Sequence, residues 1–365
     1  MKQVRMGAAA MSSLMVLFQL GSALVVSPAA RAGRDAWIST LIGVAAGMLL
    51  FLCYSNLHKR FPDMTLPAYS ETLLGRLGGK AIGMAYVVFF MYAATRDLRV
   101  GAFLIDNIAL RYTPTLIVQL LMILAVIYVL YLGIEVVGHT AVIYWAISIL
   151  LIFANIVLIF ASGIVDWRNL LPVAEDGWRV IAETGFTTAL MFPFGEMVSF
   201  TMLLPLLERK YSATGVGITS LFVGGGLLVL SSLLTVSSLG REVFQRAAFP
   251  LLNTIGKVEL SELINRVDVL VVMSIIIGVF FRIAVLFYAA IKSAEEVLHI
   301  PHGKLMVPFS LILLLSAALV APNWEEHLRE GSFMVKTVFP VFAVLLPVLL
   351  LIIAAIRQKT GRKAG

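Results

Sequence analysis

The chain has 365 residues, of which 60% are hydrophobic and 13% are charged, and its mean hydropathy is +0.96. A soluble protein carries about a quarter charged residues, so this composition excludes a soluble globular domain and indicates a polytopic membrane protein. The net charge of +7 is spread over loop ends and the tail, which argues against a nucleic-acid-binding surface, and the single cysteine, Cys53, excludes an intrachain disulfide.

Apolar spans follow one another along the chain, and no linker divides them into separate domains. We expect one integral membrane domain over residues 1–365, with helices 1–5 at about 7–162 and helices 6–10 at about 180–356. The third and eighth spans exceed the thickness of a bilayer and should tilt or protrude. The ten expected spans are residues 7–30, 36–57, 80–111, 115–134, 138–162, 180–207, 213–239, 267–298, 304–321 and 333–356.

The N-terminal apolar stretch superficially resembles a secretory signal, because Lys2 and Arg5 precede it and residues 27–32 look like a cleavage site. The apolar region of a signal peptide has about 7–15 residues, and this stretch is longer, so we expect a retained first span. An even number of spans places both termini on one side of the membrane. Basic residues at both ends of the chain favour the cytoplasm for that side.

The first span is interrupted by Gly21, Ser22 and Ala23. Small residues in a membrane helix often let two helices approach closely. The other interpretation is a break in the helix whose exposed backbone groups bind a ligand. Non-helical backbone at membrane depth is tolerated only where it lines a cavity or is buried in protein.

Charged residues interrupt the middle of the third span, where Arg96 and Asp97 are adjacent and Arg99 is close by. One interpretation is a structural ion pair within the bundle. The alternative is that Asp97 contacts a hydrated path through the protein. Adjacent residues on a helix do not share a face, so Arg96 and Asp97 should each have a different partner.

The sixth span contains a stronger break, at Phe192, Pro193, Phe194, Gly195 and Glu196. Glu196 should lie in the first turn of the second half-helix, where a carboxylate can cap free N–H groups. Carboxylates within membrane spans are usually functional. We therefore also expect Glu196 to face a cavity and to bind a proton or the ammonium group of a ligand.

Arg282 lies near the middle of the eighth span, within the run Ile-Ile-Ile-Gly-Val-Phe-Phe-Arg-Ile. No acidic residue lies within a helical turn of it, so its partner must come from another helix, with Asp97 and Glu196 as the candidates. A fixed cation at this position could replace the sodium ion that many transporters with broken helices require.

Breaks in the first and sixth spans are typical of a five-plus-five inverted repeat with a binding site near the midplane. Half-helix ends offer free N–H groups and free carbonyls, which suit a small zwitterion or polar solute. The sequence contains no P-loop, nucleophile elbow, dinucleotide-binding glycine motif or zinc-ligand spacing. We expect neither an enzyme nor a cofactor or metal.

An ordered series of motifs resembles the B subunits of spore germinant receptors, the endospore germination permeases of the amino acid–polyamine–organocation superfamily. The resemblance extends over essentially the whole chain. The motifs are residues 32–39 (Ala-Gly-Arg-Asp-Ala-Trp-Ile-Ser), Phe61-Pro62, Leu66-Pro67-Ala68-Tyr69, Arg96-Asp97, Thr113-Pro114, Gly133-Ile134-Glu135, Phe192 to Glu196, Phe249-Pro250 and Arg266-Val267-Asp268.

The resemblance implies an all-α, LeuT-type fold of ten transmembrane helices in the bacterial cell membrane or the inner membrane of an endospore. It implies a small germinant as ligand, typically an L-amino acid such as alanine and sometimes a sugar, and an A-type subunit and a C-type lipoprotein subunit as partners. It further implies that Gly21 and its neighbours, Ala93, Asp97, Phe192, Pro193 and Phe281 line the pocket or the water path below it.

Combined with the residue patterns, the resemblance defines two predicted sets of site residues. The proton or water path is expected at Arg96, Asp97 and Glu196. The predicted ligand-binding set is Gly21, Ser22, Ala23, Ala93, Phe192, Pro193, Phe194, Gly195, Glu196, Phe281 and Arg282.

The chain departs from the family pattern at a few positions. Asp97 replaces an expected glutamate and shortens the reach of the carboxylate. His139 replaces an arginine after helix 4, and Ala23 replaces a glycine at the helix 1 break.

Our first hypothesis is a ligand-sensing receptor subunit on a transporter fold. The alternative is a proton-coupled amino-acid transporter, because a fold does not determine function. A passive water or ion conduit that depends on Asp97 is a third possibility.

Overall fold

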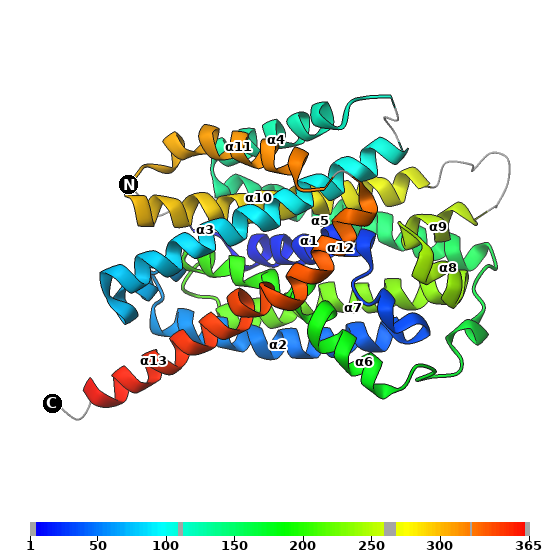
Figure 1. The fold of residues 1–365 in the computed structure, drawn as a ribbon, viewed down its shortest axis with the longest axis horizontal. Helices are drawn as coiled ribbons and strands as arrows, with labels where there is room; N and C mark the ends of the chain where they lie inside the picture. The colour runs from blue at the N-terminus through cyan, green and yellow to red at the C-terminus, as the bar shows by residue number, and fades with distance from the viewer. Residues whose placement is uncertain (1–4, 109–111, 259–267, 322, 362–365) are drawn as a thin grey trace.

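The computed structural model describes residues 5–108, 112–258, 268–321 and 323–361, and over these residues it is an elongated bundle of helices (Figure 1). The only β-type pairing in the described residues is an isolated bridge between Met6 and Leu207. Arg266 and Val267 of the last motif, and Lys2 at the N-terminus, lie outside the described residues.

The first half of the chain contributes five long helices. A short 3₁₀ segment, Ala30–Asp35, joins the first two, and another, Trp167–Leu170, follows the fifth. The helices are α1 (Ala8–Val26), α2 (Ala36–Arg60), α3 (Leu66–Ile108), α4 (Thr115–Leu132) and α5 (Ile134–Ala161).

The second half is less regular. Its sixth span consists of α6 (Trp178–Thr184), a π-helical segment (Gly185–Phe194) and two 3₁₀ segments (Gly195–Met202 and Leu204–Leu206). Two short helices, α8 (Arg241–Arg246) and α9 (Pro250–Gly256), follow the seventh span. The remaining elements are α7 (Ala213–Leu239), α10 (Asp268–Leu298), α11 (His302–Leu319), α12 (Trp324–Thr337), a π-helical turn (Val341–Leu345) and α13 (Leu346–Gly361).

Within the described residues, nine helical stretches are long and apolar enough to cross a membrane. The interrupted sixth span adds the tenth crossing, because its pieces run from residue 178 to 206. The expected architecture of ten spans is therefore confirmed. The chain begins and ends at the same end of the bundle, as an even number of crossings requires (Figure 1).

Two helices begin earlier than the hydropathy pattern predicted. α3 starts at Leu66 instead of residue 80, because a first helical piece joins the rest of α3 across a kink at Gly75 (φ 77°, ψ 173°), and Leu66, Tyr69 and Leu73 of this piece are buried in the core. α12 starts at Trp324 instead of residue 333, and the Asn323 side chain caps it by accepting a 2.8 Å hydrogen bond from the Glu326 N–H. In both cases, charged residues lower the mean hydropathy of the segment, so the hydropathy pattern does not predict the first part of the helix.

Burial varies strongly from helix to helix. The apolar window of α1 is 83% buried and that of α10 is 72% buried, whereas those of α4 and α5 are 28% and 22% buried. α1 packs against α10, α7 and α5, so it forms the centre of the bundle. The exposed apolar side chains of α4 and α5 are those expected at a lipid-facing surface.

Helices of the first half pack against their counterparts in the second. α2 contacts α7, α3 contacts α10, and α4 contacts α11, so the second, third and fourth spans pair with the seventh, eighth and ninth. This pairing is what an inverted repeat produces. The first and sixth spans are both broken, at Gly21 (φ −24°, ψ −116°) and at Phe192 (φ −129°, ψ 115°).

Candidate functional site

The break in α1 lies directly against α10. A Cβ atom on Gly21 would lie 3.0 Å from the carbonyl carbon of Gly278, and one on Gly278 would lie 2.7 Å from the Cα of Gly21. Both positions therefore need glycine for the two backbones to approach this closely. The contact brings the broken turn of α1 beside Arg282, which lies one helical turn after Gly278.

Arg282 is fully buried and joins three elements. Its Nε donates a 2.6 Å hydrogen bond to Oδ2 of Asp97 on α3, and its Nη1 donates a 3.0 Å bond to the carbonyl of Phe18 on α1. Its Nη2 forms an ion pair with Oε2 of Glu196 in the sixth span. The prediction that Arg282 pairs with Asp97 and Glu196 across the bundle is confirmed.

Aromatic rings and a hydroxyl complete the surroundings of these charges. The guanidinium carbon of Arg282 lies 4.5 Å from the ring centroid of Phe18 and 4.6 Å from that of Phe192. Ser22 donates a 2.5 Å hydrogen bond to Oδ1 of Asp97. The broken turn of α1 thus contributes both a carbonyl and a side chain to the cluster. Rings stacked on a desolvated guanidinium stabilise it.

Arg96 points to a different group of residues from Asp97. Its Nη1 lies 3.1 Å from Oε2 of Glu330, and its Nη2 donates a 2.9 Å bond to the carbonyl of His327. A Cβ on Gly331 would collide with the guanidinium, so glycine lets Arg96 cross the face of α12. The expectation of separate partners for Arg96 and Asp97 is confirmed, and the two do not form an ion pair with each other.

A cavity of about 260 Å³ lies beside the carboxylates. Asp97 and Glu196 border it, while Arg282 lies behind them and does not. Exposed Arg31 and Lys336 border the cavity as well, and Arg31 belongs to the α1–α2 connection, at the end of the bundle opposite the termini. Its walls come from the end of α1 (Val26), α3 (Ala93, Val100), the sixth span (Thr188, Phe192) and α12 (His327, Gly331, Ser332, Val335).

The predicted ligand-binding residues divide into three groups in the structure. Ala93, Phe192 and Glu196 border the cavity, as do Arg96 and Asp97 of the predicted proton path. Gly21, Ser22 and Arg282 form the layer behind the carboxylates.

The others lie elsewhere. Ala23, Pro193 and Phe194 border a separate hollow of about 20 Å³, and Gly195 packs toward Ala343. Phe281 points toward α5, where its ring centroid lies 5.6 Å from that of Tyr144.

Sequence reasoning missed α12 as a wall of the cavity. His327 is buried, and its Nε2 lies 3.1 Å from Nη2 of Arg96, while Ser332 and Lys336 border the open space. The signal was available in the sequence: five charged residues and a histidine over residues 325–336 directly precede an apolar run. A stretch with so many charged residues is typical of a loop, so its hydropathy does not indicate a half-helix.

A further break follows α12, at Pro340 and the π-helical turn. Two carbonyls of this turn accept side-chain hydrogen bonds: Tyr86 donates to Phe342 at 2.7 Å and Tyr54 donates to Ala343 at 2.6 Å. π-helical turns within helices frequently mark functional sites. The tyrosines of α2 and α3 hold the turn, so α12 and α13 are the two halves of one span, joined at a π-helical turn.

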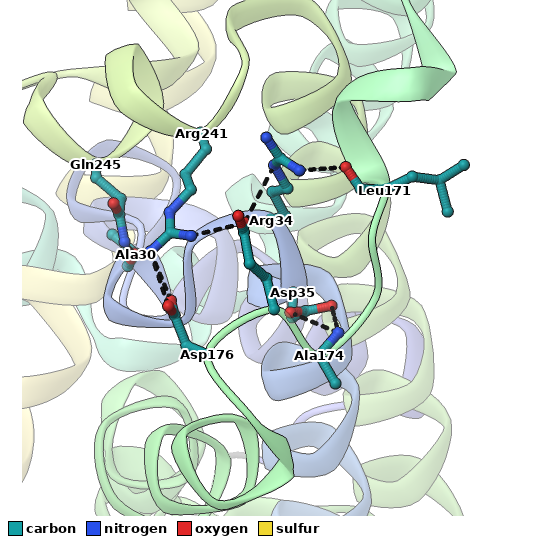
Figure 2. A network of polar contacts seen from close by, with 9 residues as sticks. Ala30, Arg34, Asp35, Leu171, Ala174, Asp176, Arg241 and Gln245 are labelled. Carbon is teal, nitrogen blue, oxygen red and sulfur yellow. Dashed lines mark hydrogen bonds and ion pairs between the residues drawn. The ribbon is translucent and has the colours of Figure 1, made fainter.

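A polar network holds the connections at the end opposite the termini (Figure 2). Arg241 of α8 lies 2.6 Å from Glu175 and 2.8 Å from Asp176 in the α5–α6 connection. The hydrogen bonds to these two carboxylates raise the pKa of Arg241. Both carboxylate oxygens of buried Asp35 accept from the Ala174 N–H at 3.1 Å, so the Gly-x-Asp-Ala motif anchors the α1–α2 connection to the same segment.

This network stands next to the cavity. Gln245 of α8 donates a 3.5 Å hydrogen bond to the carbonyl of Ala30, and Ala30 and Arg31 both border the cavity. Arg34 lies 3.5 Å from Glu175 and donates to the carbonyl of Leu171 (Figure 2). One wall of the cavity is therefore held by contacts from three separate connections.

Comparison with known protein families identifies close relatives of the chain. The model of the spore germination protein family matches residues 5–323. Spore germination protein KB of Bacillus subtilis (strain 168) is 31% identical over 366 residues, which cover 100% of this chain and 98% of that protein. Spore germination protein A2 of the same organism is 22% identical, with 96% of each chain covered.

Two solved transporters share the fold. MhsT in complex with L-phenylalanine superposes with a TM-score of 0.67 at 12% identity, covering 95% of this chain and 88% of MhsT. Mhp1, a nucleobase-cation-symport-1 family transporter with bromovinylhydantoin bound, superposes with a TM-score of 0.66 at 11% identity. The match covers 91% of this chain and 75% of Mhp1. The chain is an integral membrane protein with the LeuT fold of these transporters.

Proposed function

Because the chain belongs to the spore germination protein family, we propose that it senses a small germinant in the cavity between α1, α3, the sixth span and α12. The observation that carries this proposal is the position of Asp97 and Glu196, which border the cavity with Arg282 behind them. Ionisable side chains that face a cavity within the membrane mark ligand or ion sites. Germinant occupancy would alter the packing of the broken spans around it.

The ligand we propose is an L-amino acid. The carboxylates lie at the inner part of the cavity and the exposed cations Arg31 and Lys336 lie at its outer part, so a zwitterion can turn its ammonium group inward and its carboxylate outward. The cavity volume of about 260 Å³ is close to the lower limit of about 300 Å³ for small-molecule pockets. A neutral sugar is the alternative ligand, and it would make less use of this charge arrangement.

The signal would pass to an A-type subunit and a C-type lipoprotein subunit of a receptor in the inner membrane of an endospore. The polar network of Figure 2 supports a route outward, since Gln245 of α8 donates a hydrogen bond to the carbonyl of Ala30 at the cavity. In this arrangement the termini are cytoplasmic and the cavity opens to the opposite side.

A thermal-shift assay on the purified full-length protein tests the ligand site. The twenty L-amino acids and D-glucose are added singly to the wild type, to Ala93→Trp, and to Ala125→Trp as matched control. Ala93 is buried at the cavity and a tryptophan there fills it, whereas Ala125 is exposed on α4. We expect one compound to raise the melting temperature of the wild type and of Ala125→Trp only. An equal rise in Ala93→Trp would place the ligand outside this cavity.

A proton-coupled amino-acid transporter remains the second candidate function. The observation in its favour is the hydrogen bond from Arg282 to the Phe18 carbonyl beside the helix 1 break, where a fixed cation could take the role of a coupling sodium ion. Reconstituted vesicles with an imposed proton gradient distinguish the two functions. Uptake of an amino acid that Glu196→Gln abolishes supports transport, and binding without uptake supports sensing alone.

A further inference from the structure

The cluster behind the cavity has an unbalanced charge count. Arg282 brings one positive charge, and Asp97 and Glu196 bring two negative charges, with all three side chains at most 4% exposed. Two ionised carboxylates would leave one net negative charge buried beside a single guanidinium. An uncompensated charge in a desolvated site is strongly unfavourable, so another positive group has to neutralise it.

The other charged residues around the cavity already have partners or lie apart from the cluster. Arg96 pairs with Glu330 at 3.1 Å, and Arg31 pairs with Glu183 at 2.7 Å. Arg99 donates to the Ala321 carbonyl at 2.7 Å. Of the remaining groups, His327 faces Arg96 and Lys336 is exposed at the outer part of the cavity.

His327 supplies no positive charge either. Its Nε2 lies 3.1 Å from Nη2 of Arg96, and because a guanidinium can only donate, this ring nitrogen accepts and is unprotonated. The elements packed around the cluster therefore offer Arg282 as its single cation among the described residues. The missing charge must come from a proton or from a ligand.

Hydrogen bonding indicates which of the two carboxylates binds the proton or the ligand that supplies the missing positive charge. Asp97 accepts from Ser22 at 2.5 Å through Oδ1 and from Arg282 at 2.6 Å through Oδ2, so both of its oxygens are satisfied as a carboxylate. For Glu196, the structure records the contact to Arg282 through Oε2, and the side chain borders the cavity. Both carboxylates border the cavity, but the recorded contact of Glu196 engages only its Oε2, so Glu196 is the carboxylate with an oxygen left for a proton or a ligand.

We propose that Glu196 holds one exchangeable proton when the cavity is empty, and that a primary ammonium group replaces this proton when it binds. The O–H bond of the Glu196 carboxyl breaks, the proton leaves through the cavity to water, and the resulting carboxylate pairs with the ammonium group. The site stays neutral in both states. This inference rests on the proposed ligand cavity and specifies the chemical class that the inner part of the cavity recognises.

The experiment uses the full-length protein in lipid nanodiscs with propylammonium chloride as the probe and 1-propanol as its neutral, near-isosteric control. Infrared spectroscopy records the C=O band of a protonated carboxyl group, and an indicator dye in weak buffer records proton release. We expect propylammonium to abolish one carboxyl band and to release about one proton per protein, and 1-propanol to do neither.

Loss of the band in a variant places the proton in the cluster of Asp97, Glu196 and Arg282, and a band that changes frequency in Glu196→Asp assigns it to Glu196. Glu196→Gln should lack the band and the release, and Glu196→Asp should keep both. Asp97→Asn should also lack the band and the proton release, because the negative charge of Glu196 is then balanced by the positive charge of Arg282. Glu242→Gln on α8, exposed and outside the cavity, should behave as the wild type. Gel filtration and melting temperature establish that each variant is folded.

The results separate this inference from the proposed function. An amino acid or D-glucose that stabilises the protein without proton release, or a wild type without a band sensitive to Glu196→Gln, overturns the inference. The first of these outcomes leaves germinant sensing in the cavity intact. A Glu196-dependent band that propylammonium removes supports the inference, even if none of the germinants in the thermal-shift panel binds.

Discussion

At the scale of the residue, the arrangement depends on Arg282. The side chain is fully buried and contacts α1, α3 and the sixth span at once. Its position in an apolar run of the sequence, without an acidic neighbour, predicted partners from other helices. A buried cation is tolerated only with such partners, which is why the sequence alone could identify Asp97 and Glu196 as candidates.

Replacing Arg282 should destabilise the protein more than replacing either carboxylate. Arg282→Gln leaves Asp97 and Glu196 buried side by side without a cation, and losing one partner of a buried ion pair costs about 3–5 kcal/mol. Glu196→Gln leaves a balanced Asp97–Arg282 pair and should cost less. Denaturant titration of both variants in mixed micelles measures the difference. Equal stabilities would contradict the charge arrangement described for the cluster.

At the scale of the element, interruptions of helices decide where the cavity forms. α1 is broken at Gly21, the sixth span at Phe192 and the tenth span after α12. The glycine and proline residues at the first two breaks were visible in the sequence. The third was not recognised, because the polar half-helix α12 has the composition of a loop and Pro340 lies within an apolar run.

The close contact between α1 and α10 provides a test of helix packing. Gly278→Ala places a methyl group 2.7 Å from the Cα of Gly21, and overpacking of this kind costs about 1–3 kcal/mol. A Cβ atom on Gly226 of α7 would meet no neighbouring group within 4 Å, so Gly226→Ala should be neutral or slightly stabilising because alanine favours a helix. The melting temperatures of Gly278→Ala and Gly226→Ala are compared with that of the wild type. An unchanged melting temperature for Gly278→Ala would argue against the close approach of α1 and α10.

At the scale of the whole molecule, the termini lie at one end of the bundle (Figure 1). The cavity is bordered by Ala30 and Arg31 of the α1–α2 connection, at the opposite end. The connections on the cavity side are joined by the network of Arg34, Glu175, Asp176 and Arg241 (Figure 2). Exposed ion pairs contribute only about 0–1 kcal/mol each. The network therefore acts mainly by fixing the geometry of the cavity wall, since it joins segments that are far apart in the sequence.

Cysteine labelling tests the orientation in the membrane. In a Cys53→Ala background, Lys210→Cys lies at the end that carries the termini, and Arg168→Cys lies at the opposite end; both positions are exposed. With cytoplasmic termini, an impermeant maleimide added to intact cells should label Arg168→Cys only. Labelling of Lys210→Cys instead would invert the topology and place the cavity mouth on the cytoplasmic side.

The sequence by itself determined the membrane class, the ten crossings and the two main breaks, because hydropathy, glycine and proline act locally along the chain. It also identified Asp97 and Glu196 as candidate partners of Arg282, since a charge buried in the membrane needs a partner of opposite charge, even one from another helix. Only the tertiary structure decided that α12 forms a wall of the cavity and that Phe281 turns toward Tyr144. The direction of a side chain depends on which helices pack beside it, and those contacts join residues that no local pattern connects.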